Sequence, residues 1–185
     1  VISKIKRKTY KDLDEFDNDS NLLTVENGIL HLDTLELTAH TPTNLSKILI
    51  PCEFNKPKSD DIETNFKDTV FWKYLTSSFT LDNKLDKDGR TNVLEMMASC
   101  FLKHNVDEKS FMNLGNGENG KSVCLDYLSS LLGKENISHI PLQVLSEDKF
   151  ASAKLDGKLA NIFADLERNE LRHTGIIKVI SSGEP

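Results

Sequence analysis

The fold of this chain is decided by Gly115-Asn116-Gly117-Glu118-Asn119-Gly120-Lys121-Ser122, which fits the phosphate-binding pattern G-x-x-x-x-G-K-[ST]. A triphosphate is large and highly charged, so the backbone must wrap it closely and donate several N–H groups. The glycines at 115, 117 and 120 allow the required backbone angles and leave no Cβ in the way. We therefore predict that all eight residues of this loop bind a nucleotide.

Two side chains of the loop have predicted roles, one as a positive charge and one as a metal ligand. Lys121 supplies a positive charge near the β and γ phosphates and is a predicted catalytic residue. Ser122 can place its hydroxyl in the coordination shell of Mg²⁺, so it is a predicted metal ligand. The expected cofactors are ATP and Mg²⁺. The alternative is a chance match in a glycine-rich turn, and the flanking sequence argues against it.

The loop should follow a buried strand and open a helix. Ser110–Leu114 is short and largely apolar, with a polar break at Asn113, and is predicted as that strand. A helix is predicted from Lys121 to Gly133, with its N-terminal dipole directed at the phosphates. Its apolar residues recur at helical spacing: Val123, Leu125, Leu128, Leu131 and Leu132.

The second half of the site is predicted at the end of the apolar strand Leu159–Ala164, which is broken once by Asn161. Strand ends in parallel sheets open onto the ligand crevice, so Asp165 is placed to hold the metal. Glu167 lies two residues further and would polarise the attacking water, with Glu170 as a nearby competitor. The alternative is an acidic loop after a core strand.

Ahead of the ATPase segment, three regions are predicted. Residues 1–20 have a basic start and an acidic run, typical of a linker arm, with a DNA-contacting arm as the alternative. Residues 21–58 form a small β-rich segment: Asn27-Gly28 predicts a hairpin, Leu35–Thr38 a third strand and Lys47–Ile50 a further possible strand. Residues 59–108 form a helical bundle, on either side of the polar stretch Asp82–Arg90.

The bundle prediction rests on two apolar stripes at 3.6-residue spacing, which are typical of core-facing helices. They consist of Phe66, Val70, Phe71, Tyr74, Leu75 and Phe79, and of Val93, Met96, Met97, Cys100, Phe101 and Leu102. Residues 109–185 are the first part of the ATPase domain, with further helices predicted over Val144–Asp156 and Gly175–Ser181. The predicted class is α/β: a P-loop NTPase (AAA+-like) core with parallel strands, preceded by a β-meander and a helical bundle.

The composition of the chain limits its possible partners and its cellular compartment. The chain has 185 residues and a net charge of −6, which argues against gripping nucleic acid over a broad basic face but leaves room for a few basic side chains in a groove or pore. No apolar run approaches the ~20 residues of a membrane span. Three widely spaced cysteines favour a reducing, cytoplasmic compartment. The chain begins at Val1 and ends on Gly183-Glu184-Pro185, so we expect a piece of a longer polypeptide.

The loop, with Asn119 directly before Gly-Lys-Ser, resembles that of superfamily 3 helicases, closest to the primase–helicases of large DNA viruses, phages and plasmids. The resemblance covers most of the chain. Leu23–Leu30 followed by His40-Thr41-Pro42 is similar to the domain that precedes the helicase core in that family, and Gly157–Asp165 resembles its second acidic motif. Lys178–Glu184 looks like the start of the next motif.

The resemblance implies a hexameric ring that hydrolyses ATP to move along single-stranded DNA together with replication proteins. Two features depart from the family. The acidic motif reads Asp-Leu-Glu rather than adjacent acids, which leaves the role of Glu167 open. The chain also stops before the sensor asparagine and arginine finger that the family implies, so we expect this piece alone to be inactive.

Three functions are compatible with these residues. The first is a fragment of an ATP-driven replicative DNA helicase. The second is a non-catalytic nucleotide-binding module that assembles a replication complex. The third is a small-molecule kinase, which is weakened because Arg168 and Arg172 are the only arginine pair after the loop and no lid of closely spaced arginines follows.

Overall fold

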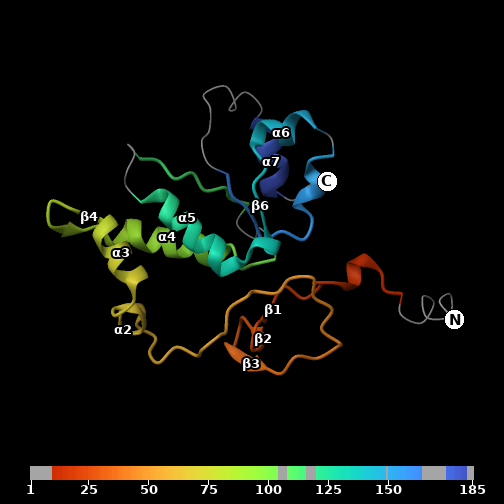
Figure 1. Cartoon of the computed structure of the whole chain (residues 1–185), viewed down its shortest axis with the longest axis horizontal. Coiled ribbons are helices and arrows are strands. Elements are labelled where there is room, and N and C mark those ends of the chain that lie inside the picture. The colour runs from red at the N-terminus through yellow and green to blue at the C-terminus, as the bar shows by residue number, and fades with distance from the viewer. Residues whose placement is uncertain (1–9, 104–107, 116–119, 149, 164–173, 183–185) are drawn as a thin grey trace. The chain divides into compact units, whose positions relative to one another are not determined.

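The chain divides into two units, Val1–Phe54 and Asn55–Pro185, which are described separately (Figure 1). The structure, a computed structural model, describes residues 10–103, 108–115, 120–148, 150–163 and 174–182. Over these residues the protein is mixed α/β, with a small antiparallel sheet in the first unit and a parallel strand pair in the second.

The first unit is built on a three-stranded antiparallel meander in the order β1-β2-β3, preceded by the short 3₁₀ helix η1 (Leu13–Glu15). The strands are β1 (Leu22–Val25), β2 (Gly28–His31) and β3 (Glu36–Thr38), so the predicted hairpin and third strand are confirmed. Ile50 forms a single parallel bridge with Val25, and the possible strand over Lys47–Ile50 is reduced to that bridge.

Side-chain alternation on the meander builds the core of the first unit. Strand β1 buries Leu23 and Val25 on one face, and Leu30 of β2 pairs with Leu23 on that face. The other buried apolar residues of the unit are Ile29, Ile48 and Ile50. Asp17, within the predicted linker arm, accepts hydrogen bonds from Ser46 Oγ and from the backbone N–H of Lys47. The carboxylate thereby ties residues before the sheet to the segment after it.

The tight turn between β1 and β2 also fixes the end of the unit. Val25 pairs with Gly28, so the turn consists of Glu26 and Asn27. Asn27 Nδ2 donates to the carbonyl oxygen of Phe54 at 2.9 Å, and the Phe54 N–H donates to Asn27 Oδ1 at 2.9 Å. A single amide side chain thus satisfies both backbone groups of the residue at which the first unit ends.

The second unit begins with three helices: α2 (Ile62–Phe66), α3 (Val70–Ser78) and α4 (Lys87–Ser99). Each helix has an N-cap side chain that accepts a backbone N–H: Asp61, Thr69 and Asp86. The polar stretch predicted between the stripes contains β5 (Lys84–Leu85), which pairs with β4 (Thr80–Leu81) just before the stretch to form a hairpin. Asp82 and Asn83 have φ angles of 50° and 60°, as a type I′ turn requires.

The apolar stripes are only partly core. Of the stripe residues, Leu75, Met96 and Met97 are buried, and Trp72, which lies outside both stripes, is buried as well. Phe66, Val70 and Leu102 are 44%, 83% and 38% exposed, so these three predicted core positions are wrong. The stripe does not run along one helix, because α2 ends at Phe66 and α3 begins four residues later after the Thr69 cap.

The helix after the phosphate loop, α5 (Lys121–Leu132), ends against Gly133 at φ 84°, and the predicted bounds are confirmed. The strand predicted over Ser110–Leu114 is wrong: residues 108–115 form neither helix nor strand, and Leu114 is 82% exposed. A strand needs a neighbour for its backbone groups. Within the described residues the parallel sheet consists of β6 (Ile137–Ser138) and β7 (Ala160–Asn161) alone.

Short helices surround this strand pair: η2 (Lys134–Asn136), α6 (Leu142–Glu147), η3 (Ser152–Leu155) and α7 (Thr174–Ser182). The helix predicted over Gly175–Ser181 is therefore confirmed as α7, and α6 packs on it (Figure 1). One helix over Val144–Asp156 is wrong. Asp148 adopts extended angles, and its carboxylate accepts the Phe150 N–H at 2.9 Å, a local bond that competes with helix continuation.

Gly28 is the tightest position in the meander, because a Cβ there would collide with the carbonyl oxygen of Thr38. Gly28→Ala is expected to lower the free energy of unfolding of the first unit by about 1–3 kcal/mol. The measurement is urea unfolding followed by far-UV circular dichroism and by fluorescence of Trp72, which is the only tryptophan of the chain and belongs to the second unit.

The variant should shift the circular dichroism transition and leave the fluorescence transition in place. Gly175→Ala is the control, since a Cβ there meets nothing within 4 Å. Superimposable dichroism curves for Gly28→Ala and the unmodified chain would contradict the packing argument.

Candidate functional site

The described ends of the phosphate loop lie together. Gly115, Gly120, Lys121 and Ser122 are described, whereas Asn116, Gly117, Glu118 and Asn119 lie outside the described residues. Lys121 Nζ donates to the carbonyl oxygen of Gly115 at 3.2 Å. The lysine side chain therefore reaches from the first turn of α5 to Gly115, the first glycine of the loop.

Gly120 makes the junction between loop and helix. It has φ 80° and ψ 5°, a left-handed conformation that suits glycine, and it is the N-cap residue of α5. The helix that follows leaves its first backbone N–H groups without acceptors of its own, at the end that favours an anion. Ser122 is exposed on this first turn. The geometry at the described end of the loop is thus that of an anion-binding helix start.

Helix α3 holds this junction from outside the loop. The Tyr74 hydroxyl donates to the carbonyl oxygen of Gly120 at 2.7 Å, and burial raises the pKa of the Tyr74 phenol. A Cβ at Gly120 would lie 2.8 Å from Tyr74 Cε2. Glycine is therefore required at position 120 for the space as well as for the backbone angle.

A second contact joins the same two helices, one turn earlier on α3 and two turns further along α5. The Phe71 and Tyr127 rings stack with centroids 3.9 Å apart and an angle of 17° between their planes. The sequence pattern places Tyr74 in an apolar stripe and does not predict its hydrogen bond to Gly120. The available signal was its hydroxyl, because a phenol on a core-facing stripe needs a hydrogen-bond partner.

The described residues stop just before the acidic half of the predicted site. Strand β7 ends at Asn161, and Phe163 is the last described residue of this segment. Asp165 and Glu167 lie outside the described residues, as do Glu170, Arg168 and Arg172. The joint metal site of Ser122 and Asp165 therefore stays a prediction. Among the described residues, no group of three or more His, Cys, Asp or Glu side chains is placed to hold a metal ion.

Asn161, the polar break in the predicted strand, has a structural role. Its Oδ1 accepts from Ser138 Oγ and from the Ile140 N–H, both at 2.8 Å, and its Nδ2 donates to the Ile140 carbonyl oxygen at 2.8 Å. The side chain thereby continues the pairing between the two segments where β6 ends. This clamp fixes the last part of β7 before the chain reaches the acidic motif.

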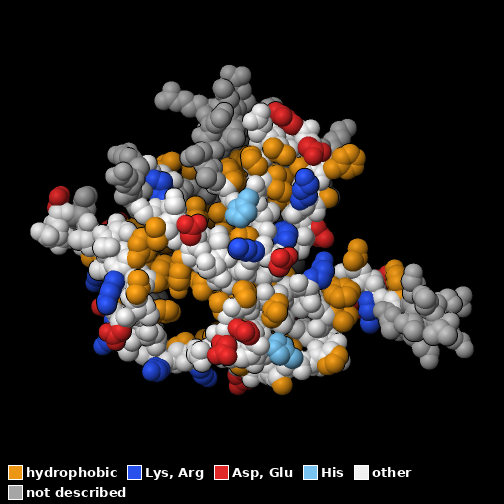
Figure 2. Space-filling model, viewed as in Figure 1, with side chains coloured by type: hydrophobic (Ala, Val, Ile, Leu, Met, Phe, Trp, Pro, Cys, Tyr) orange, Lys and Arg blue, Asp and Glu red, His pale blue; other side chains and the backbone are white. Residues whose placement is uncertain are grey.

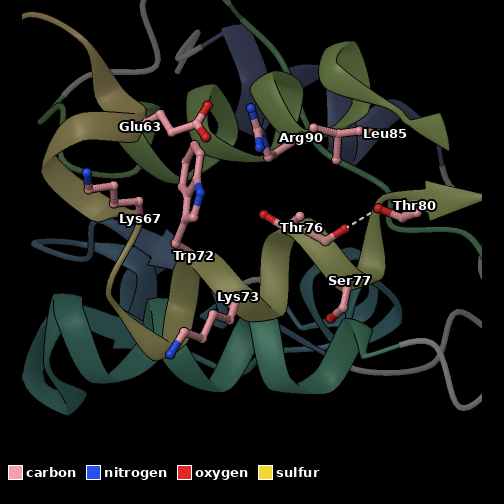
Figure 3. Close-up of a pocket in the computed structure, with 9 residues that line it drawn as sticks. All are labelled: Glu63, Lys67, Trp72, Lys73, Thr76, Ser77, Thr80, Leu85 and Arg90. Atoms are coloured by element: carbon pink, nitrogen blue, oxygen red, sulfur yellow. Dashed lines mark hydrogen bonds between the residues drawn. The ribbon is translucent and has the colours of Figure 1, made fainter. Parts of the chain in front are cut away.

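A groove of about 670 Å³ lies on the second unit, on the face of α3 that carries Trp72 (Figure 3). The Arg90 guanidinium lies 4.2 Å from the centroid of the Trp72 ring, a cation–π contact between α4 and α3. Lys67, Lys73 and Arg90 line the groove together with Glu63. On the face drawn in Figure 2, basic and acidic side chains are interspersed over the described part of the chain, without a continuous basic patch.

Comparison with known proteins identifies two family matches and one relative. Residues 1–76 match the family described as "D5 N terminal like", and residues 114–185 match "Family of unknown function (DUF5906)". The protein "Putative helicase L207/L206" of Acanthamoeba polyphaga mimivirus is 23% identical over 206 aligned residues, which cover 100% of this chain and 20% of that protein. The chain thus spans about a fifth of the length of this relative.

These matches confirm the predicted resemblance to the primase–helicase type of protein found in viruses and phages. The first family match covers the meander, α2 and most of α3, and the second covers the segment from Leu114 onward. Within the described residues, no helix is both long enough and apolar enough to cross a membrane.

Replacing Asn161 tests whether the clamp supports the strand pair. Asn161→Leu leaves the Ile140 N–H, its carbonyl oxygen and Ser138 Oγ without their partner and is expected to destabilise the second unit by about 1–3 kcal/mol for each group that stays buried. Ser138→Ala removes only one of the three hydrogen bonds and should cost less. Urea unfolding followed by Trp72 fluorescence measures both, and an equal loss in the two variants would exclude the clamp.

Proposed function

We propose that this chain, which is of the viral and phage primase–helicase type, is the nucleotide-binding part of an ATP-dependent replicative DNA helicase. ATP held by residues 115–122 would drive translocation on single-stranded DNA. The observation that supports this best is the loop junction: Gly120 is left-handed at the start of α5, and the Lys121 side chain returns to Gly115 across the loop. A left-handed glycine at a helix start lets the backbone N–H groups approach a phosphate closely.

The proposed roles follow from the chemistry of each group. Backbone N–H groups of the loop and of the first turn of α5 bind the phosphates, and the Lys121 ammonium neutralises charge near the β and γ phosphates. Ser122 and Asp165 would hold Mg²⁺, which supplies charge neutralisation and orients the phosphates when bound. Glu167 would orient the attacking water. The parallel pair β6–β7 supports a P-loop NTPase (AAA+-like) core, in which Asp165 follows the end of a strand.

Single-stranded DNA, replication proteins and further copies of the chain, as a hexamer, are the proposed partners. The net charge of −6 and the interspersed charges favour DNA contact through a few side chains in a narrow passage, rather than over a broad surface. Such a passage arises when several copies surround one strand.

The second candidate is a nucleotide-binding assembly module without turnover. It is favoured by the irregular backbone of residues 108–115, because a loop without a paired strand before it is less firmly held for catalysis. Both functions require nucleotide binding at the loop, and they differ in phosphate release.

Lys121→Ala tests the proposal directly. Loss of a charge-assisted contact of about 1.5–3 kcal/mol is expected to weaken binding of a fluorescent ATP analogue with Mg²⁺ by at least about tenfold. Lys134→Ala is the control, since Lys134 follows the opposite end of α5. Unchanged affinity in Lys121→Ala would remove the loop from the function.

Phosphate release and sedimentation then separate the two candidates. These measurements use the unmodified chain, and a longer protein that contains it, with and without single-stranded DNA. Release stimulated by DNA supports the helicase. Nucleotide-dependent assembly without release supports the assembly module.

A further inference from the structure

We propose that Tyr74 is a positioning residue for the nucleotide: from helix α3 it fixes the orientation of the peptide that joins Gly120 to Lys121. This inference rests on the proposed function and adds a residue outside the loop motif to the phosphate site. It also makes α3 the element that responds when a nucleotide occupies the loop.

The Gly120 carbonyl oxygen accepts two hydrogen bonds. It accepts the Tyr74 hydroxyl at 2.7 Å and the Cys124 N–H of the first turn of α5 at 3.1 Å. A carbonyl oxygen has two lone pairs, and both are used here. The direction of this carbonyl group is therefore fixed by two donors from different helices.

The peptide bond between Gly120 and Lys121 is trans and planar, so its C=O and N–H groups point in opposite directions. The Gly120 carbonyl oxygen accepts from Tyr74, so the Lys121 N–H points away from the Tyr74 hydroxyl. This N–H is the first of the helix-start donors that would bind a phosphate. Tyr74 thus sets the direction of one donor of the phosphate site without contacting the phosphate.

Tyr74 is itself held in place by the aromatic ring before it on α3. Phe71 lies one turn before Tyr74 on the same face of α3, stacks on Tyr127 of α5 and has its ring centroid 6.1 Å from that of Tyr74. Gly120 and Tyr127 are seven residues apart, so they lie on one face of α5. Two contacts two turns of α5 apart prevent α3 from rotating on α5.

Rotation of the 120–121 peptide toward a phosphate would therefore move α3 or break the Tyr74 bond. Trp72, two residues before Tyr74, points to the other side of α3, where the Arg90 guanidinium lies over its ring in the groove of Figure 3. As the only tryptophan, Trp72 reports on α3 by its fluorescence. Nucleotide binding at the loop is expected to change this signal through Tyr74.

The test uses Tyr74→Phe, which keeps the ring and removes the hydroxyl. Affinity for the fluorescent ATP analogue with Mg²⁺ is expected to fall about two- to tenfold, the equivalent of one hydrogen bond. The change in Trp72 fluorescence at saturating ATP should be lost. Ser77→Ala is the matched control: it removes a hydroxyl bond of 2.9 Å to the backbone carbonyl of Tyr74 but keeps the Tyr74 hydroxyl, and it should leave both readouts unchanged.

Wild-type affinity and a wild-type fluorescence change in Tyr74→Phe would overturn the inference while the proposed function stands, because the unmodified chain and Lys121→Ala test that function separately. Equal losses in Tyr74→Phe and Ser77→Ala would also overturn it, since they indicate a general effect on α3. If Tyr74→Phe does not fold, Phe71→Leu decides: it keeps the hydroxyl but removes the stacking, and should reduce the fluorescence change more than the affinity. An unaltered fluorescence change in Phe71→Leu would overturn the inference.

Discussion

The second unit depends on the carbonyl oxygen of Gly120, where the end of the phosphate loop, the start of α5 and the face of α3 meet. A left-handed residue without a Cβ is needed there, because the Tyr74 ring occupies the space in which a side chain would lie. The phosphate-loop motif is usually described by what it offers to a ligand. Here its last glycine is equally a packing position for a helix that precedes it by more than forty residues.

Local signals allowed much of the fold to be predicted. The Asn27-Gly28 pair between apolar runs predicted the hairpin, although Gly28 belongs to β2 and the turn residues are Glu26 and Asn27. Gly133 predicted the end of α5, because a residue with a positive φ is needed there. The predictions that were wrong depended on partners distant in the chain. Residues 110–114 are apolar enough for a strand but pair with no strand among the described residues. Asp148 ends a helix that the spacing of the flanking apolar residues would continue.

The same distinction applies to the candidate site. The loop residues could be read from the motif, whereas Tyr74 and Asn161 act through partners 46 and 21–23 residues away, which no local pattern contains. Asn161 looked like a defect in an apolar strand. It is the side chain that joins β7 to the segment after β6, and so steadies the approach to the acidic motif. Asp165 and Glu167 stay predictions, because they lie outside the described residues.

The amide of Asn27 has a mechanical consequence for the whole chain. By holding both backbone groups of Phe54, it makes the hairpin turn the anchor from which the linker to α2 departs. A pulling force on that linker would be carried by the two hydrogen bonds between Asn27 and Phe54 and transmitted to the turn between β1 and β2. The first unit would therefore resist unfolding from its C-terminal end until that turn opens.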